Sequence, residues 1–259
     1  MNLIAFGKNT LVNLLNSKLL SFKKIIISSE KEKNYKGILS VIKKKNIVYE
    51  ILNKLEFNRF IPDKKHQGII AFLNNFNYLT LEELIERFIN EKNIFFVMLD
   101  SIEDPHNFGA IIRTCAALSI HGIIILDKNQ VQINSTVLKV STGGISHIPI
   151  CRVSSLEKSI KALKLKNFTI FSAVCQYGEK SNNNEMYSSK KCVIFGNEHD
   201  GIKKKLVKIS DQLVSIPLYN EMNSLNVSVS CGIVIHNLKN YQVLIEKNLD
   251  DDLKFSSDF

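Results

Sequence analysis

Three short segments of the sequence carry residue types that could do chemistry. The first, residues 104–113 (DPHNFGAIIR), leads from a turn shaped by a proline into a predicted helix. Arg113 at its end stands among apolar residues, and a guanidinium in such a setting needs a partner. That partner is either an anionic ligand or an internal salt bridge. Asn107 in the same segment is typical of a helix N-cap.

The second and third segments hold glycines and polar side chains that suit a binding loop. Residues 196–201 (GNEHDG) place Glu198 between two glycines, which allow a ligand close to the backbone. No GK[ST] follows, so this is not a Walker motif, and alone it fits a plain turn equally well. In residues 216–229 (IPLYNEMNSLNVSV), Ser224 and Asn226 are cap-type residues whose hydroxyl and amide are equally able to bind a ligand.

Each of these segments follows a predicted strand. From residue 93 onwards strands and helices alternate, which predicts a parallel sheet with helices on both faces and ligands at the carboxyl ends of its strands. The apolar pattern predicts strands at 94–100, 121–126, 168–174, 192–195 and 213–217, and helices at 107–119, 156–165 and 201–209. Residues 225–240 fit either a strand or a helix, because they show both alternation and a spacing of four.

The first quarter of the chain is predicted to be a small α/β domain with a strong positive charge. It has strand patterns at 25–28, 47–49 and 68–72 and a helical pattern at 10–20, and residues 74–92 form a linker with an amphipathic helix at 81–90. Residues 1–73 hold 14 Lys and Arg against 5 Asp and Glu, whereas residues 74–259 hold 20 of each. The whole formal charge of +9 therefore lies in this region, which favours phosphate binding.

The composition excludes several classes of protein. With 45% apolar and 23% charged residues the chain is expected to fold, and it has no apolar run near the about 18 residues that span a bilayer. No signal peptide is recognisable, so a cytoplasmic location is expected.

The histidines show no metal-ligand spacing, and we expect no metal. The cysteines are odd in number and lack CxxC spacing, so all five are expected to be reduced and buried: Cys115, Cys151, Cys175, Cys192 and Cys231. The lysine triplets at 43–45 and 203–205 are interpreted as solvated helix faces.

Taken together, in this order and spacing, the three segments resemble the SpoU (TrmH-type) RNA 2'-O-ribose methyltransferases of the SPOUT superfamily. Residues 104–116 resemble the family motif DPxNxGAxxRTA, residues 196–201 resemble GxExxG, and residues 216–230 resemble IPMxGxxxSLNVSVA. Residues 140–149 (VSTGGISHIP) also match a family loop. The resemblance covers about 95–240, and it departs from the family at Ser119 and Asn220, where glycine is usual.

The N-terminal region carries a looser resemblance of its own. Residues 4–15 (IAFGKNTLVNLL) and 66–71 (HQGIIA) are similar to the small substrate-binding domain of the 23S rRNA guanosine-2'-O-methyltransferase subgroup. That domain is related to ribosomal L30e-like RNA binders. The resemblance implies a division into an L30e-like RNA-binding domain (1–73), a linker (74–92), a methyltransferase domain (93–242) and an acidic tail (243–259).

The family resemblance also implies a fold and a set of binding residues. The methyltransferase domain would be an α/β-knot, a deep trefoil with a parallel sheet, in which residues 225–240 form a helix threaded through the knot. S-adenosylmethionine would bind in the knot, held by Gly196, Ile216 and Leu225, and the protein would be a homodimer.

In the reaction that the resemblance implies, a ribose 2'-hydroxyl attacks a sulfonium methyl group. Arg113 is expected to stabilise the developing alkoxide, because a guanidinium is a poor base. Glu198 accepts the proton or orients Arg113, while Asn107, Ser224 and Asn226 position the ribose and the loops. The expected substrate is a guanosine of 23S rRNA. The alternatives are a tRNA guanosine-2'-O-methyltransferase, or a non-catalytic RNA-binding or ribosome-assembly protein on the same fold.

Overall fold

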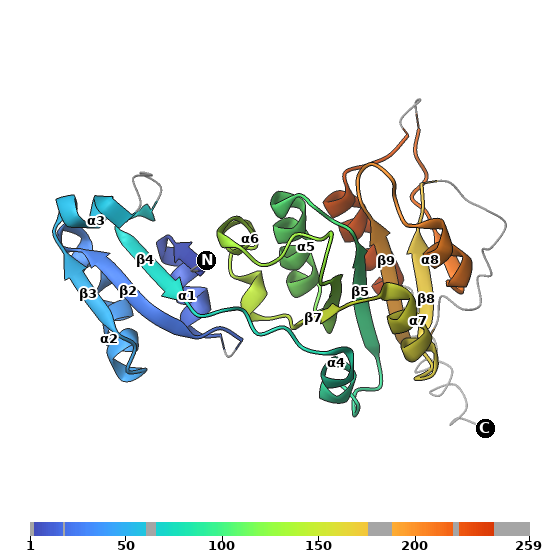
Figure 1. Ribbon diagram of the computed structural model, residues 1–259, viewed down its shortest axis with the longest axis horizontal. Helices are drawn as coiled ribbons and strands as arrows, with labels where there is room; N and C mark the ends of the chain where they lie inside the picture. The colour runs from blue at the N-terminus through green and yellow to red at the C-terminus, as the bar shows by residue number, and fades with distance from the viewer. Residues whose placement is uncertain (1–2, 18, 61–65, 176–187, 220–222, 241–259) are drawn as a thin grey trace, which may run out of the picture.

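The computed structural model describes residues 3–17, 19–60, 66–175, 188–219 and 223–240. Two β-sheets stand at opposite ends of the molecule, one built by the first 73 residues and the other by the remainder (Figure 1). We refer to residues 3–73 as the N-terminal region and to residues 94–240 as the C-terminal region. The acidic tail at 243–259 and Asn220 lie outside the described residues.

The N-terminal region is a mixed four-stranded sheet in the order β1-β4-β2-β3. Its strands are β1 (Leu3–Phe6), β2 (Phe22–Ser28), β3 (Tyr49–Leu52) and β4 (Ile69–Leu73). β4 runs antiparallel to both β1 and β2, whereas β3 is parallel to β2. The predicted helix at 10–20 is α1 (Lys8–Leu15). The short 3-10 helix η1 (Ser29–Tyr35) leads into α2 (Lys36–Lys44). α1 and α2 pack together on one face of the sheet. α3 (Lys54–Phe60), which the pattern did not predict, lies on the other face through the buried Phe57.

The C-terminal region is a six-stranded sheet in the order β10-β8-β9-β5-β6-β7, and all its pairs are parallel, as predicted. Its strands are β5 (Ile94–Asp100), β6 (Gly122–Leu126), β7 (Ile150–Val153), β8 (Thr169–Ala173), β9 (Lys190–Gly196) and β10 (Gln212–Val214). Helices cover both faces. α5 (Pro105–Ala117) and α6 (Ser135–Val140) pack on one face, and α4 (Leu81–Arg87), α7 (Leu156–Lys164) and α8 (Lys204–Ile209) on the other. The sequence pattern missed β7 and α6.

The ambiguous segment near the end of the chain is a helix over residues 227–240. Its buried side chains recur at helical spacing and join the cluster that also holds α5: Val227, Cys231, Val234, Ile235 and Leu238. Two lysine side chains form hydrogen bonds near residue 240 of this helix. The buried Lys191 donates to the Leu238 carbonyl at 2.9 Å, and Lys239 donates to the Leu118 carbonyl at 2.5 Å. Burial lowers the pKa of Lys191 to about 8.

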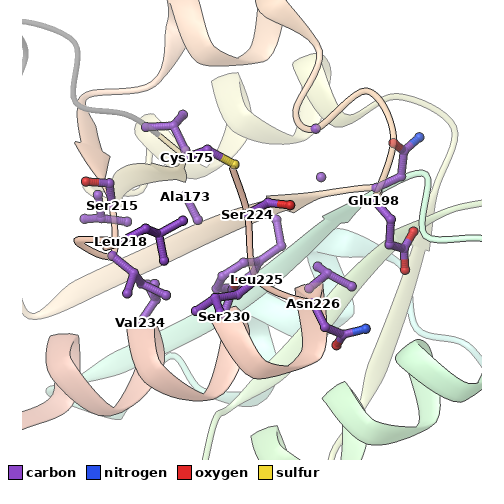
Figure 2. Close-up of a pocket in the computed structure, with 18 of the residues that line it drawn as sticks. Ala173, Cys175, Glu198, Ser215, Leu218, Ser224, Leu225, Asn226, Ser230 and Val234 are labelled. Atoms are coloured by element: carbon purple, nitrogen blue, oxygen red, sulfur yellow. The ribbon is translucent and has the colours of Figure 1, made fainter. Parts of the chain in front are cut away.

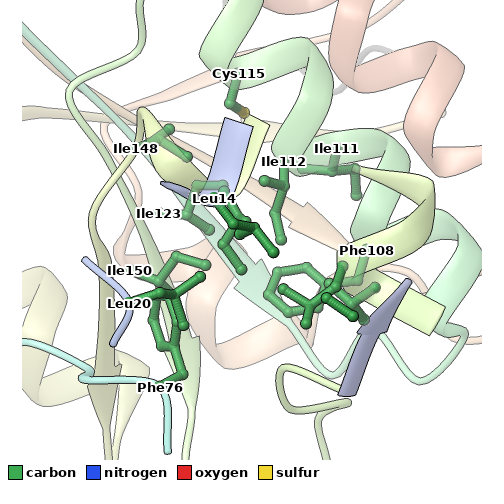
Figure 3. Packing of buried hydrophobic residues seen from close by; sticks show 14 of the residues in the cluster. Leu14, Leu20, Phe76, Phe108, Ile111, Ile112, Cys115, Ile123, Ile148 and Ile150 are labelled. Atoms are coloured by element: carbon green, nitrogen blue, oxygen red, sulfur yellow. The ribbon is translucent and has the colours of Figure 1, made fainter. Parts of the chain in front are cut away.

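The two regions share one hydrophobic cluster rather than standing apart. Leu14 and Leu20 of the N-terminal region belong to the same cluster as Ile112 and Ile150 of the C-terminal region (Figure 3). Two hydrogen bonds cross the same boundary. The Ile4 amide donates to Ser135 Oγ at 3.3 Å, and Asn13 Nδ2 donates to the Thr142 carbonyl at 3.0 Å. The loop at 140–149 therefore lies against α1.

Four of the five cysteines are buried as predicted, but the prediction is wrong for Cys175, which is exposed. Burial raises the pKa of Cys151 to about 12 and also raises those of Cys192 and Cys231, so these thiols stay protonated at neutral pH. Among the helices of the described residues, none combines the length and the apolar character needed to cross a bilayer.

Candidate active site

The sheet topology brings two of the three sequence segments directly together. β5 and β9 are neighbouring parallel strands, and their last residues, Asp100 and Gly196, are paired in register. The segments at 104–113 and 196–201 leave from these adjacent strand ends. The third segment, which follows β10, leads into the helix 227–240, and this helix packs against α5. Residues from three distant parts of the sequence thus meet at one edge of the sheet.

The start of α5 differs from the prediction that Asn107 is its N-cap. The N-cap is Asp104, whose Oδ1 accepts a hydrogen bond from the His106 amide at 2.8 Å, and Pro105 occupies the first helical position. Since Asp104 already caps the helix, the amide of Asn107 is released for contacts beyond α5. The helix ends at Ala117. Ser119 follows with φ 51°, a left-handed conformation that favours glycine, which is the residue that the family motif usually has at this position.

Asn107 is the centre of a chain of hydrogen bonds that joins all three segments. Its Nδ2 donates to Glu198 Oε1, and its Oδ1 accepts from Asn226 Nδ2 at 2.9 Å. Asn226 Oδ1 in turn accepts from the Ser228 amide at 2.9 Å and so caps the helix 227–240. The orientation of one carboxylate is therefore coupled to the start of two helices. We call Asn107, Glu198 and Asn226 the polar triad.

The loop that carries Glu198 is tightly folded. A Cβ placed on Gly196 would lie 2.0 Å from the carbonyl carbon of Gly201, so this position accepts only glycine. Asn197 Oδ1 accepts hydrogen bonds from the amides of His199 and Asp200 at 3.0 and 2.6 Å, which closes an Asx-type turn. Gly201 completes the loop with φ 65°.

An ion pair that no sequence pattern indicated fixes the far end of this loop. Asp100 is 1% exposed, and its two carboxylate oxygens accept from the backbone amide of Lys203 at 2.9 Å and from Lys203 Nζ at 2.8 Å. Ser101 Oγ also contacts both partners. The triplet at 203–205 is exposed, as its interpretation as a solvated face predicts, but Lys203 also pairs with this buried carboxylate. We call Asp100 and Lys203 the loop clasp.

A cavity of about 430 Å³ opens beside the triad, between the strand ends and the helix 227–240 (Figure 2). Five predicted residues besides Glu198 line it: Gly196, Ile216, Ser224, Leu225 and Asn226. Its volume lies in the range of small-molecule sites, and apolar walls alternate with hydroxyl and backbone groups. Further lining residues were not predicted from the sequence, among them Cys175, Ser215, Leu218, Ser230 and Val234. Continuing the helical spacing from Asn226 would have pointed to Ser230 and Val234.

A second hollow of about 370 Å³ borders the same loop. Glu103, Asp104 and Asn107 line it together with Asn197, Glu198 and His199, and the last three also border the first cavity. Glu198 therefore lines two hollows. Such a position suits a group that contacts two ligands.

Arg113 lines neither of these cavities and is exposed on α5. It lies six residues beyond Asn107, which turns its side chain by about 120° around the helix and moves it about 9 Å along the axis. Among the hydrogen bonds and ion pairs of the described residues none includes Arg113, so the internal salt bridge is not formed there. Within one chain the partner of Glu198 is Asn107. No group of three or more His, Cys, Asp or Glu in the described part of the chain is arranged to hold a metal ion.

Two family models match the chain and together span most of it. The SpoU rRNA Methylase family matches residues 94–236, and the RNA 2'-O ribose methyltransferase substrate binding family matches residues 4–79. An uncharacterized tRNA/rRNA methyltransferase of Mycoplasma genitalium is 37% identical over 80% of this chain and 86% of its own length.

Solved structures share the fold across nearly the whole chain. The AdoMet-bound rRNA methyltransferase of Sinorhizobium meliloti superposes with a TM-score of 0.75 at 19% identity, covering 93% of this chain and 87% of that one. The SpoU methyltransferase of Streptomyces viridochromogenes, in complex with AdoMet, has a TM-score of 0.77 at 16% identity, covering 93% and 91%. The chain thus has the fold of these solved methyltransferases. This chain belongs to the SpoU rRNA methylase family.

Proposed function

We propose that this protein transfers a methyl group from S-adenosylmethionine to the 2'-hydroxyl of a ribose in RNA, and that its target is a guanosine of 23S rRNA. The observation that carries the proposal is the polar triad beside a cavity of cofactor size. In this proposal the carboxylate of the triad removes the proton and the cavity holds the methyl donor. The RNA substrate makes a cytoplasmic location the expected one.

The cavity suits S-adenosylmethionine by size and by chemistry. When bound, this cofactor supplies a methyl group on a sulfonium that departs as a neutral thioether. Ile216 and Leu225 offer apolar surface to an adenine ring, and the closed backbone at Gly196 offers amide and carbonyl groups to its edge. Ser224 and Ser230 add hydroxyl groups along the wall. The two AdoMet-bound structures that share the fold support the same assignment.

The triad gives Glu198 the role of proton acceptor in this proposal. Asn107 and Asn226 hold its carboxylate in one orientation, and general-base catalysis depends on such a fixed geometry. The second hollow, which Glu198 also lines, then receives the ribose. Asn107 and Ser224 position the sugar and the adjoining loop.

We further propose that the protein acts as a homodimer through the exposed face of the helix 227–240. Two apolar residues of this helix at a spacing of four are exposed, Val229 at 50% and Ile233 at 36%, and they form a stripe on that face. A stripe of this kind typically packs against a partner. Thr114 of α5 lies close to Gly232 of this helix, and Arg113, which precedes Thr114, is exposed. Docking of a second copy brings Arg113 to the facing subunit, where it stabilises the alkoxide.

The rRNA assignment rests on the N-terminal region. We propose residues 1–73 as an L30e-like RNA-binding domain, 74–92 as the linker, and 93–242 as a knotted methyltransferase domain. The basic charge of the first 73 residues and the match to a substrate-binding family support this division. A tRNA target is the second candidate, because the Mycoplasma genitalium relative is described as a tRNA/rRNA methyltransferase. A non-catalytic RNA-binding protein is the third, and the intact triad argues against it.

Ribose-methylation mapping of total RNA from cells with and without the gene tests the proposal. We expect the loss of one 2'-O-methyl mark at a guanosine of 23S rRNA, and its return with the wild-type gene but not with Glu198→Gln. Loss of a tRNA mark instead would establish the second candidate. An unchanged methylation map together with a defect in ribosome assembly would establish the third.

A further inference from the structure

The sheet of the N-terminal region has one face that is only partly covered. α1 and α2 bury the face that carries Leu3 and Ala5. On the opposite face α3 covers Ile26 and Ile70 through the buried Phe57. Beyond this contact, Ile4 and Phe72 remain half-buried, although they are apolar and paired in register on neighbouring strands. Part of this sheet face is therefore accessible.

Two aromatic rings border the accessible part of this sheet face. Phe60, the last residue of α3, is 47% exposed and meets Phe72 in an edge-to-face contact with ring centroids 6.1 Å apart. An exposed phenylalanine has no polar atom that benefits from water. An edge-to-face pair leaves one ring face free for a flat partner. The flat apolar partner that an RNA-modifying protein meets most often is an unpaired base.

Two lysines lie on the same sheet face, one opposite Phe72 and one over the ring of Phe6. Lys24 lies opposite Phe72 across the β2–β4 pair, where it also contacts Glu50. On the β1 side, Lys139 Nζ lies 5.3 Å above the ring of Phe6. Aromatic rings on a four-stranded sheet with neighbouring cations are the pattern by which such sheets bind single-stranded RNA. A protein partner has no comparable need for the lysines.

The accessible face leads towards the catalytic site. Lys139 belongs to α6, and the Ile4 amide donates to Ser135 Oγ at the start of the same helix. α6 packs closely on α5, since a Cβ on Gly109 would lie 2.7 Å from Val140 Cβ. α5 carries Asn107 of the triad. An RNA strand bound on this face would therefore end next to α6 and α5, the helices that support the candidate active site.

We propose that Phe60 and Phe72, with Ile4 and Lys24, form a stacking platform for unpaired bases of the RNA substrate. The platform holds nucleotides that flank the target, while the target ribose enters the site of the C-terminal region. Because every base has an apolar face, the platform reads unpaired structure and not sequence. This inference rests on the proposed function, since it assumes an RNA substrate.

The absence of tryptophan from the sequence allows a direct optical test. Phe60→Trp introduces a single tryptophan at the platform, and Leu55→Trp introduces one at a 78% exposed position of the same helix. We expect single-stranded oligoadenylate to quench the fluorescence of Phe60→Trp by about half and to leave Leu55→Trp unchanged. Inorganic polyphosphate, which has the charge but no bases, should quench neither. Equal responses of the two variants, or quenching by polyphosphate, would overturn the platform.

Binding and kinetics separate this inference from the proposed function. Phe60→Ala should weaken binding of single-stranded RNA roughly 10- to 100-fold, the loss expected for one base stack, and raise the KM for RNA with kcat unchanged. Leu55→Ala is the matched control and should change neither. If wild-type protein transfers no methyl group but the quenching is seen, the proposed function fails and the platform stands. If methyl transfer is normal and Phe60→Ala has the KM of wild type, the platform fails alone. A changed oligomeric state in Phe60→Ala, by sedimentation, would show that the face binds a second copy instead.

Discussion

The two sheets of this protein differ in where their functional side chains are accessible. In the C-terminal region all strands are parallel and both faces lie under helices, so functional side chains collect only where strands end. In the N-terminal region the sheet is mixed, and part of one face with its aromatic and basic side chains remains accessible. The first arrangement suits a small enclosed ligand, and the second suits a long charged polymer.

The charge distribution follows the same division. The formal charge of +9 lies within the first 73 residues, and the remainder carries none. The hollow beside the polar triad is acidic by contrast, since Glu103, Asp104 and Glu198 line it. Under the proposed function, RNA is attracted by the first region and methylated by the second. The two functions should therefore fail separately when each region is changed.

The loss of Arg113 should have the largest effect, because it should slow methyl transfer and leave cofactor binding unchanged. We expect Arg113→Ala to lower kcat by about 10²–10³, as for removal of one group that stabilises a developing oxyanion. Cofactor affinity should remain near that of wild type, because Arg113 does not line the cavity. Calorimetric titration with S-adenosylmethionine and a methyl-transfer assay measure the two effects. Arg87→Ala, on the exposed end of α4, is the control, and lost cofactor binding in Arg113→Ala would contradict this role.

Breaking the loop clasp should impair both the cavity and the triad. Asp100→Asn removes the charge that holds Lys203, so the loop that carries Glu198 loses its anchor. We expect up to about 10²-fold lower kcat/KM, since a displacement of about 1 Å at a reacting group has an effect of this size. Asp211→Asn is the matched control, because Asp211 also pairs with a lysine, Lys164, on another part of the sheet. Equal losses in the two variants would mean that general stability, not loop position, is responsible.

Lysine substitutions should distinguish the two regions by their salt dependence. Replacing Lys43, Lys44 and Lys45 with alanine should reduce the slope of log affinity for RNA against log salt by about 0.7 for each phosphate that the protein no longer neutralises. Replacing Lys204 and Lys205 in the C-terminal region should leave the slope unchanged. Filter binding at several salt concentrations measures both. The reverse result would place the RNA-binding surface in the C-terminal region.

The buried Lys191 should make stability depend on pH. Its pKa is about 8 in the folded protein and about 10.5 in the unfolded chain, so between these values the unfolded state binds more protons. Stability therefore rises with pH across this window. From about pH 7.5 to 9.5 the wild type should gain about 1–2 kcal/mol in free energy of unfolding relative to Lys191→Met. Urea unfolding of both proteins at the two pH values tests this, and parallel changes would show that the lysine is not desolvated.

The sequence predicts the C-terminal region well where local patterns decide. β5 occupies the predicted residues 94–100, and the parallel arrangement follows from the alternation of strands and helices. The convergence of Glu198, Asn107 and Asn226 also agrees with their positions after strands. Short elements with weak periodicity, such as α3 and β7, were missed because a few residues give little pattern.

The remaining differences from the prediction have separate causes. Asn107 is a good cap by type, but Asp104 stands nearer the helix start and takes the position. The pairing of Asp100 with Lys203 depends on two neighbouring strand ends, which no local pattern reveals. Cys175 has an apolar sequence environment yet lies at the cavity, because β8 ends there.

The identity of the methylated atom tests the central claim most directly. Purified protein is incubated with S-adenosylmethionine and 23S rRNA transcript, and the digested nucleosides are separated by mass spectrometry. We predict 2'-O-methylguanosine as the product, with a yield at least about 10²-fold lower for Glu198→Gln. A base-methylated nucleoside, or full activity of Glu198→Gln, would contradict the assignment of the triad to ribose methylation.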